Sequence, residues 1–260
     1  MTRIAVLHPG AMGARVGAAL VECGHDVVWL PEGRGMATAD RAHHAGLRGV
    51  TDLDGCDLVL SVVPPMAAVD TARWVAGYRG RYVDANAISP ATARQVAAIV
   101  TAGGATYTDG GIIGLPPDRS GSTRLYLSGP DAGGVAPLFD GAKIEARVLV
   151  DGGPYAASAL KMTYAAWTKI SAALVLAARS AAESLGVEQA LAAEWALSQP
   201  GLEWRWELAT RDGVNKGWRW TDEMREIART LSAAGQPGGF GEAAAELFSR
   251  FTRPDDTPSS

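Results

Sequence analysis

The sequence predicts an α/β protein, with a doubly wound parallel sheet in residues 1–150 and an all-helical domain in residues 151–260. Three observations support this fold class. Short apolar runs alternate with helical patterns through the first 150 residues, which is typical of a doubly wound sheet. The run Asp57–Val63 is apolar almost throughout, as expected for a strand buried on both faces. The alternation stops at Asp151-Gly152-Gly153-Pro154, and only helical patterns follow.

The first elements form a strand–turn–helix–strand unit. Ile4–Leu7 is the expected strand, His8–Gly13 a glycine turn, Ala14–Cys23 a helix and Asp26–Leu30 the second strand. This length suits a βαβ crossover, which places the helix N-terminus directly after the first strand. Free N–H groups and the positive end of the helix dipole make that position suitable for a pyrophosphate.

Strands and helices continue to alternate up to residue 150. We expect strands at 47–50, 57–63, 81–84, 105–108, 124–128 and 143–150, and helices at 36–45, 66–76, 90–101 and 132–139. The helix at 90–101 should begin with Pro90, directly after Ser89. Ligands of such sheets bind outside the carboxyl ends of the strands. Those ends are expected at His8–Gly13, Leu30–Arg34, Val63–Pro65, Asp84–Ser89 and Asp109–Leu115.

The second domain opens with one long helical pattern that reaches Leu185. Mostly apolar residues recur in it every three or four positions and form a seam for another helix, at Leu160, Thr163, Trp167, Ile170, Leu174, Ala177 and Ala181. Further helices are expected at 188–197, 203–210, 221–233 and 242–251, followed by a frayed polar tail at 252–260. A seam of this length has no intrachain helix of equal length to cover it, which predicts a homodimer.

Composition narrows the range of partners. The chain has 260 residues, 47% of them hydrophobic, and a net charge of −4 without a basic block, so nucleic-acid binding is not expected. Cys23 and Cys56 are not in zinc or C-x-x-C spacing, which indicates reduced core residues and no metal site. Because no apolar run approaches the length of a membrane span and no signal segment precedes the first strand, we expect a cytoplasmic protein without membrane contact.

The glycine turn matches most of the dinucleotide-binding fingerprint G-x-G-x-x-G. His8 occupies the first position, while Gly10 and Gly13 occupy the second and third. Gly10 allows backbone to approach a phosphate, and Gly13 allows the helix to lie against the strand. The turn therefore predicts a Rossmann domain in which Gly10, Ala11, Met12 and Gly13 bind the cofactor. The alternative is that the glycines serve only helix packing.

Glu32 and Arg34 follow the second strand, about 20 residues after the glycines. An acid at this place holds the ribose 2′-hydroxyl of NAD, whereas an arginine holds the 2′-phosphate of NADP. Arg34 lies in a flexible Gly33-Arg34-Gly35 loop that suits a phosphate clamp, which favours NADP with NAD still possible. Arg34 as a plain solvated charge is the other interpretation.

Lys161 stands near the start of the long helix, in the segment GGPYAASALKMTY. Tyr164, Thr168 and Ser171 share its helix face and form a polar strip on an apolar helix. A lysine among small apolar residues is suited to act as a general acid or base. An ion-paired or solvent-reaching lysine near a helix start explains the same pattern, and spacing alone does not choose between them.

Five motifs together resemble the 3-hydroxyisobutyrate/6-phosphogluconate dehydrogenase superfamily, which includes β-hydroxyacid dehydrogenases and imine reductases: HPGAMG, DLVLSVVPP, VDANAISP, TDGGIIGLPP and GGPYAASALKMTY. The resemblance implies NAD(P)-dependent hydride transfer on a small-molecule substrate, with Lys161 as general acid/base. It also implies that Asn86 lies in the substrate-binding loop and that the nicotinamide lies near Val63, Pro64, Pro65 and Asn86. The segments NKGWRWTDEMREIA and GFGEAAAELF resemble the short helical domain of poorly characterised members of this group.

The sequence departs from this superfamily where substrate is held. Tyr164-Ala165 replaces its asparagine pair, so Tyr164 becomes the candidate hydroxyl group one turn from Lys161. A carboxylate substrate would need a cation, for which Lys161 and Arg219 are the candidates. Three functions stay open: a dehydrogenase acting on a small hydroxy acid or carbonyl compound, an imine reductase, and a non-catalytic NAD(P)-binding sensor.

Overall fold

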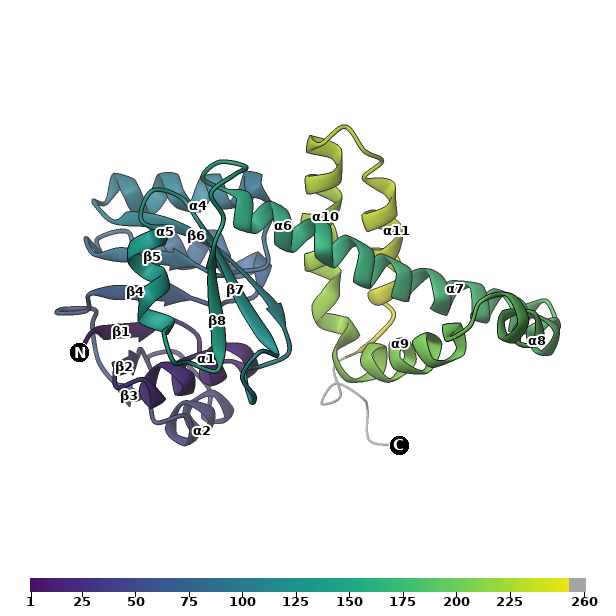
Figure 1. Ribbon diagram of the computed structural model, residues 1–260, viewed down its shortest axis with the longest axis horizontal. Coiled ribbons are helices and arrows are strands. Elements are labelled where there is room, and N and C mark those ends of the chain that lie inside the picture. The colour runs from purple at the N-terminus through teal and green to yellow at the C-terminus, as the bar shows by residue number, and fades with distance from the viewer. Residues whose placement is uncertain (253–260) are drawn as a thin grey trace. The chain divides into compact units, whose positions relative to one another are not determined.

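The computed structural model describes residues 1–252 and divides the chain into two compact units, Met1–Lys161 and the residues from Met162 on (Figure 1). Apart from Thr252, the tail expected to be frayed lies outside the described residues. The assignment of substrate binding and dimerisation to the second domain stays a prediction.

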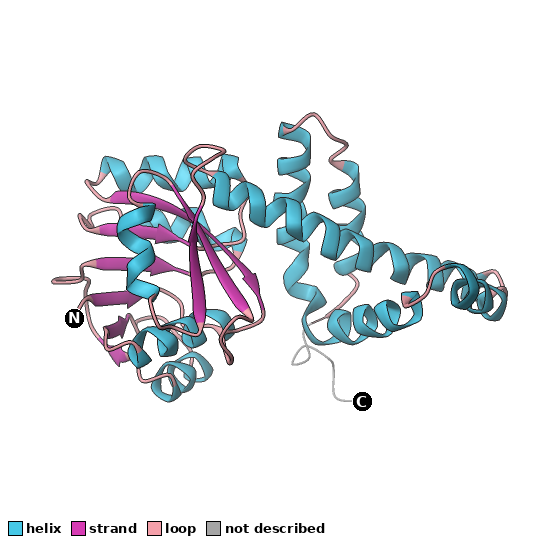
Figure 2. Ribbon diagram, viewed as in Figure 1, coloured by secondary structure: helices cyan, strands magenta, loops and turns pink. Residues whose placement is uncertain are grey.

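A sheet, magenta in Figure 2, forms the centre of the first unit. It has eight strands in the order β3-β2-β1-β4-β5-β6-β7-β8. Its strands are β1 (Arg3–Val6), β2 (Asp26–Trp29), β3 (Arg48–Gly49), β4 (Leu58–Ser61), β5 (Arg81–Asp84), β6 (Thr106–Gly114), β7 (Thr123–Ser128) and β8 (Ile144–Val148). Every neighbouring pair is parallel except β6 and β7. The predicted doubly wound sheet is thereby confirmed. The chain leaves β1 in one direction and β4 in the other, so the carboxyl ends of these two strands flank the point where ligands bind in such sheets.

Helices cover both faces of the sheet because alternate strand residues point to opposite sides. The helices are α1 (Ala11–Glu22), α2 (Met36–His44), α3 (Ala68–Trp74), α4 (Pro90–Ala102) and α5 (Ala132–Val135), with short 3₁₀ turns η1 (Pro65–Ala67) and η2 (Ala136–Phe139). Ile4 and Val6 pack with α1, α2 and α5, whereas Ala5 and Leu7 pack with α3 and α4. α4 begins at Pro90 as predicted, and Ser89 caps it by accepting a hydrogen bond from the Thr92 backbone N–H at 3.2 Å.

The segment Asp109–Leu115 was expected to be a loop after a strand ending at residue 108, and this was wrong. β6 continues to Gly114 because residues 109–114 pair with β7 in antiparallel register, from Asp109 opposite Ser128 to Gly114 opposite Thr123. The helix expected at 132–139 also divides. Pro137 lies at its break, where the ring removes a backbone N–H and a 3₁₀ turn replaces the α-helix.

The second unit is helical. Its elements are α6 (Ala156–Ala165, which begins in the first unit), η3 (Ala166–Ile170), α7 (Ser171–Ser184), α8 (Glu188–Ser198), α9 (Leu202–Lys216), η4 (Gly217–Arg219), α10 (Trp220–Ala233) and α11 (Gly239–Phe248). The long predicted helix is continuous, but a π-helical turn, η3, interrupts its α geometry. Trp220 of α10 packs edge-on against Phe248 of α11 with ring centres 4.9 Å apart, and Met224, Ile227 and Phe248 are completely buried. Within residues 1–252, no helix combines the length and the apolarity that crossing a membrane requires.

Candidate cofactor and catalytic site

The glycine turn joins β1 to α1 at the edge where ligands are expected. The Gly10 backbone N–H donates to the His8 carbonyl oxygen at 2.8 Å, and among the described residues no side chain caps the N-terminus of α1 at Gly10. A Cβ atom at Gly13 would lie 2.3 Å from the His8 carbonyl oxygen, so only glycine fits there. The N–H groups of Ala11, Met12 and Gly13 belong to the first turn of α1, where helix geometry provides no carbonyl partner within the helix, and they therefore suit phosphate oxygens.

The charges of two arginines act on His8. Burial, together with the positive charges of Arg34 and Arg41, lowers the pKa of His8. Arg41 donates from Nε to the Pro9 carbonyl oxygen at 3.3 Å and from Nη2 to Thr38 Oγ1 at 2.9 Å. Within the described residues, His8 Nδ1 and Arg34 Nε are buried without a hydrogen-bond partner. Sequence reasoning found Arg34 but missed Arg41, because no local pattern links a residue inside α2 to the glycine turn.

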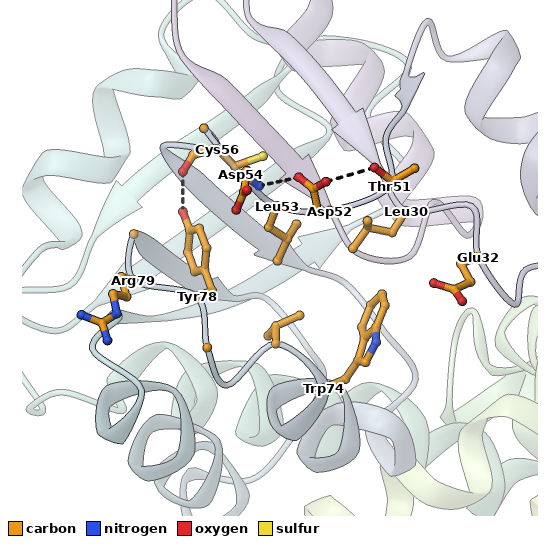
Figure 3. A pocket seen from close by; sticks show the side chains of 14 residues that line it. Leu30, Glu32, Thr51, Asp52, Leu53, Asp54, Cys56, Trp74, Tyr78 and Arg79 are labelled. Atoms are coloured by element: carbon orange, nitrogen blue, oxygen red, sulfur yellow. Dashed lines mark hydrogen bonds between the residues drawn. The ribbon is translucent and has the colours of Figure 1, made fainter.

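A groove opens beside the end of β2. It is lined by Leu30, Glu32, Leu53 and Trp74, among others, as Figure 3 shows, and its volume is about 550 Å³. That volume lies within the range of small-molecule pockets. The Arg34 guanidinium carbon lies 6.0 Å from the centre of the Trp74 ring, a cation–π distance. The two residues predicted to contact the ribose, Glu32 and Arg34, thus both lie near Trp74.

Asn86 ties the end of β5 to the end of β4. Its side chain is 2% exposed, donates from Nδ2 to Ser61 Oγ at 3.1 Å, and accepts from the Val63 backbone N–H at 2.6 Å. These hydrogen bonds use both ends of the amide and set the path of the chain into Pro64 and Pro65. Of the predicted residues after β4, Val63 is buried and Pro64 is exposed. This geometry favours a positioning role for Asn86 over direct contact with a substrate.

Two carboxyl groups are buried where β5 and β6 pair, at Asp84 opposite Asp109. Burial raises the pKa of Asp84 to about 7, and the nearby charge of Asp109 adds to that effect. Burial likewise raises the pKa of Asp109 to about 6, and the hydrogen bonds that Asp109 accepts partly offset this rise because they favour its charged form. Asp84 accepts from the Asn86 backbone N–H at 3.1 Å and from the Tyr107 hydroxyl at 3.3 Å.

The start of α6 is attached to the sheet by side chains of β6 and β7. Asp109 accepts from the Ser158 backbone N–H at 2.8 Å, and Ser128 Oγ accepts from the Ala157 backbone N–H at 3.0 Å. Ser128 also donates from Oγ to Asp109 at 3.0 Å. Two N–H groups of the first helical turn are thereby satisfied by strand residues, which fixes the direction in which α6 leaves the sheet.

Lys161 lies directly on β6. A Cβ atom at Gly111 would lie 3.0 Å from the Lys161 Cβ atom and 2.6 Å from the Ala157 carbonyl oxygen, so α6 crosses the strand where only glycine fits. Gly111 lies two residues beyond Asp109, the last position at which β6 pairs with β5. The backbone of Lys161 is therefore held at the carboxyl-end edge of the parallel strands.

The polar strip predicted around Lys161 is partly used by the helix itself. Thr168 donates from Oγ1 to the Tyr164 carbonyl oxygen at 3.3 Å, and Ser171 donates from Oγ to the Trp167 carbonyl oxygen at 2.6 Å. The Tyr164 side chain is 47% exposed. Among residues 1–252, no three His, Cys, Asp or Glu side chains gather in a way that could hold a metal ion.

Comparisons with known proteins identify relatives of the fold. Residues 182–251 match a family model described as a domain of unknown function (DUF1932). A search of curated proteins finds no match. The conserved protein MTH1747, whose structure was described as similar to 3-hydroxyacid dehydrogenases, is 27% identical, with 95% of this chain and 96% of that chain covered and a TM-score of 0.71.

Two further solved structures have names that state an activity. 3-Hydroxyisobutyrate dehydrogenase from Mycobacterium tuberculosis, solved with L-serine, is 20% identical over 96% of this chain and 93% of that chain, with a TM-score of 0.71. A reductive aminase from Aspergillus terreus, solved with NADPH and ethyl levulinate, is 18% identical over 96% and 93%, with a TM-score of 0.58. The resemblance to hydroxyacid dehydrogenases and imine-reducing enzymes is confirmed at the level of the fold.

Proposed function

We propose that this protein is an NAD(P)-dependent oxidoreductase that transfers a hydride between the nicotinamide ring and a small hydroxy acid or carbonyl compound. The observation that carries the proposal is the position of Lys161, held against Gly111 at the strand edge that also carries the glycine turn. A proton-transferring side chain and a phosphate-binding helix N-terminus at one edge are what hydride transfer requires of a protein.

The residues of the first unit fit a dinucleotide. Gly13 leaves room for close packing of α1, the first N–H groups of that helix suit a pyrophosphate, and Arg34 supplies a cation at the end of β2. The backbone from Val63 to Pro65, held by Asn86, would border the nicotinamide. When bound, the nicotinamide supplies or accepts the hydride. The arginine favours NADP over NAD, and Glu32 leaves NAD binding possible.

Lys161 would manage the proton. In the reducing direction its Nζ donates a proton to the substrate oxygen while the carbon receives the hydride. In the oxidising direction Nζ takes that proton back as the alcohol becomes a carbonyl group. Asp109, Ser128 and Gly111 position this lysine through the start of α6. Tyr164, one helical turn later, would add a hydroxyl group for the substrate.

The test replaces Lys161 with alanine and measures turnover with a panel of hydroxy acids, ketones and imines. We expect kcat to fall by about 100- to 10,000-fold, because general acid–base catalysis contributes that much, while the Kd for NADPH stays unchanged. Lys143→Ala is the matched control, since Lys143 is a partly exposed lysine paired with Glu22 at 2.9 Å. Undiminished turnover of the Lys161→Ala variant would end the proposed role.

Imine reduction is a second candidate, favoured by the shared fold of the NADPH-bound reductive aminase. The same chemistry applies, with Nζ of Lys161 donating its proton to nitrogen instead of oxygen. Turnover on cyclic imines but not on ketones or hydroxy acids would select this activity. Tight NADPH binding without turnover on any member of the panel would instead support the non-catalytic sensor, which the sequence Tyr164-Ala165 motivates.

We also propose that the second unit forms a homodimer. Trp167 and Leu174, two members of the predicted seam, are 68% and 69% exposed. Leu174 lines an apolar groove between α7 and α11 together with Ile170 and Phe240. A second copy of the chain would cover this face, because a long helix with an exposed apolar stripe is stabilised by a symmetric neighbour.

A further inference from the structure

Arg41 is a cation on α2 whose position is fixed by the core beneath it. Its neighbour Ala42 is completely buried in the sheet core, so the helix cannot rotate to carry Arg41 away from the glycine turn. From this position its Nε reaches the Pro9 carbonyl oxygen at 3.3 Å. The side chain therefore spans from α2 to the second residue of the fingerprint turn.

Arg41 and Arg34 are not neutralised by acids. Neither forms an ion pair with a carboxylate among residues 1–252, although Glu32 and Asp40 lie on the same connecting segment. Arg15 on α1, by contrast, pairs with Asp118 at 3.3 Å. A guanidinium group without a carboxylate in ion-pair distance is available to a bound anion.

The imidazole of His8 completes the arrangement. Its ring would lie 3.2 Å from a Cβ atom at Gly10, so it packs against the turn at the position where the fingerprint has its first glycine. Its buried Nδ1 has no hydrogen-bond partner among the described residues, and neither has Arg34 Nε. The positive charges of Arg34 and Arg41 both lower the pKa of this ring, after burial, and Arg41 also contacts the adjacent Pro9 carbonyl oxygen.

The chemistry of the anion follows from its place. The pyrophosphate of a dinucleotide belongs at the N-terminus of α1, whereas Arg34 and Arg41 lie on the connection that follows β2, where the adenosine ribose is held. The anion that lies at the ribose is the 2′-phosphate, which distinguishes NADP from NAD. Two guanidinium groups offer a phosphate dianion paired, charge-assisted hydrogen bonds.

We propose that Arg41 is a cofactor-specificity residue, which together with Arg34 clamps the 2′-phosphate of NADP while His8 closes the site on the side of the turn. The proposal rests on the proposed function, since it assumes that a nicotinamide dinucleotide binds at this edge. It adds that discrimination between NADP and NAD depends on a residue inside α2 and not only on the loop after β2.

The test is equilibrium binding of four probes to the purified Arg41→Gln protein: NADPH, NADH, 2′,5′-ADP and 5′-ADP. We expect affinity for the two probes with a 2′-phosphate to fall about 10- to 100-fold, the worth of a charge-assisted contact, and affinity for the other two to change less than about threefold. Arg48→Gln is the matched control, because Arg48 pairs with Asp26 at the opposite end of β2. This control should leave all four affinities unchanged.

An equal loss for all four probes would overturn the proposal, because it would mean that Arg41 only holds the Pro9 turn in shape. Unchanged NADPH affinity would overturn it as well. If Arg41→Gln unfolds, Arg41→Lys keeps the charge, and the proposal then requires this variant to retain a preference for 2′,5′-ADP over 5′-ADP. If the wild-type protein binds neither NADPH nor NADH, the proposed function itself is contradicted. If the wild-type protein binds NADPH but Arg41→Gln loses affinity equally for all four probes, only this inference is contradicted.

Discussion

Asp84 should make the protein less stable as the pH rises. Its carboxyl group is 1% exposed and its pKa is raised to about 7, mainly by burial and further by the charge of Asp109. An acid with a raised pKa in the folded state binds its proton more tightly there than in the unfolded chain. Stability is therefore highest when Asp84 is protonated, and it is lost as the pH rises from the unfolded value of about 4 through about 7.

The magnitude follows from the two pKa values. Between pH 5 and pH 8, Asp84 alone lowers the free energy of unfolding by about 2–3 kcal/mol. Asp109, with a pKa raised to about 6, adds a smaller loss over the lower part of this range. The substitution Asp84→Asn keeps the shape and an acceptor oxygen for the Asn86 backbone N–H but removes the ionisable proton. Relative to wild type, this variant should gain about 2–3 kcal/mol on going from pH 5 to pH 8.

Urea unfolding, followed by circular dichroism at several pH values from 5 to 8, measures this difference. Comparing variant with wild type cancels the opposite contribution of His8, whose lowered pKa makes both proteins less stable as the pH falls below about 6.5. Asp70→Asn is the control, because it makes the same substitution at an exposed aspartate on α3. If the unfolding free energy of the variant minus that of wild type stays constant across this range, or falls as the pH rises, the reasoning is refuted.

Two further predictions concern the glycine turn and the exposed helix face. Gly13→Ala should weaken NADPH binding at least tenfold and destabilise the protein by about 1–3 kcal/mol, because the new Cβ atom would lie 2.3 Å from the His8 carbonyl oxygen. Calorimetric titration measures the binding and thermal unfolding measures the stability. The control is Gly133→Ala, which should change neither quantity because a Cβ atom there meets nothing within 4 Å. Leu174→Glu should convert a dimer to a monomer, because Leu174 is 69% exposed and lines the apolar groove between α7 and α11. Light scattering measures the mass, and a monomeric wild-type protein would contradict the proposed dimer.

The strands of the parallel sheet could be predicted because burial on both faces leaves a direct trace in the sequence. Leu58–Ser61 is buried at every position, and in the sequence it is apolar at every position except Ser61. The glycine turn His8–Gly13 could be predicted as well, since Gly10 and Gly13 lie between a strand and a helix. Such features depend on residues close together in the chain, which is why a single sequence contains them.

The extension of β6 could not be predicted in the same way. Its residues Asp109–Gly114 contain three glycines, a composition that usually indicates a loop. The glycines are needed for tertiary reasons: a Cβ atom at Gly110 would lie 2.9 Å from the Asp84 carbonyl oxygen, and one at Gly111 would meet α6. Arg41 was missed for a related reason, because its hydrogen bond joins residues 32 positions apart. Neither the pairing of residues 109–114 with β7 nor the contact of Arg41 with Pro9 leaves a pattern in neighbouring residues of the sequence.

The position of Lys161 shows how the two kinds of information combine. The sequence identifies the lysine, but α6 alone does not determine where it lies. The Asp109 carboxyl group holds the Ser158 backbone N–H, and the absent side chain of Gly111 lets the helix lie against β6. A larger residue at Gly111 would therefore move the lysine without altering it, because its Cβ atom would lie 3.0 Å from that of Lys161. The proposed proton transfer thus depends as much on two residues of a strand as on the lysine that would perform it.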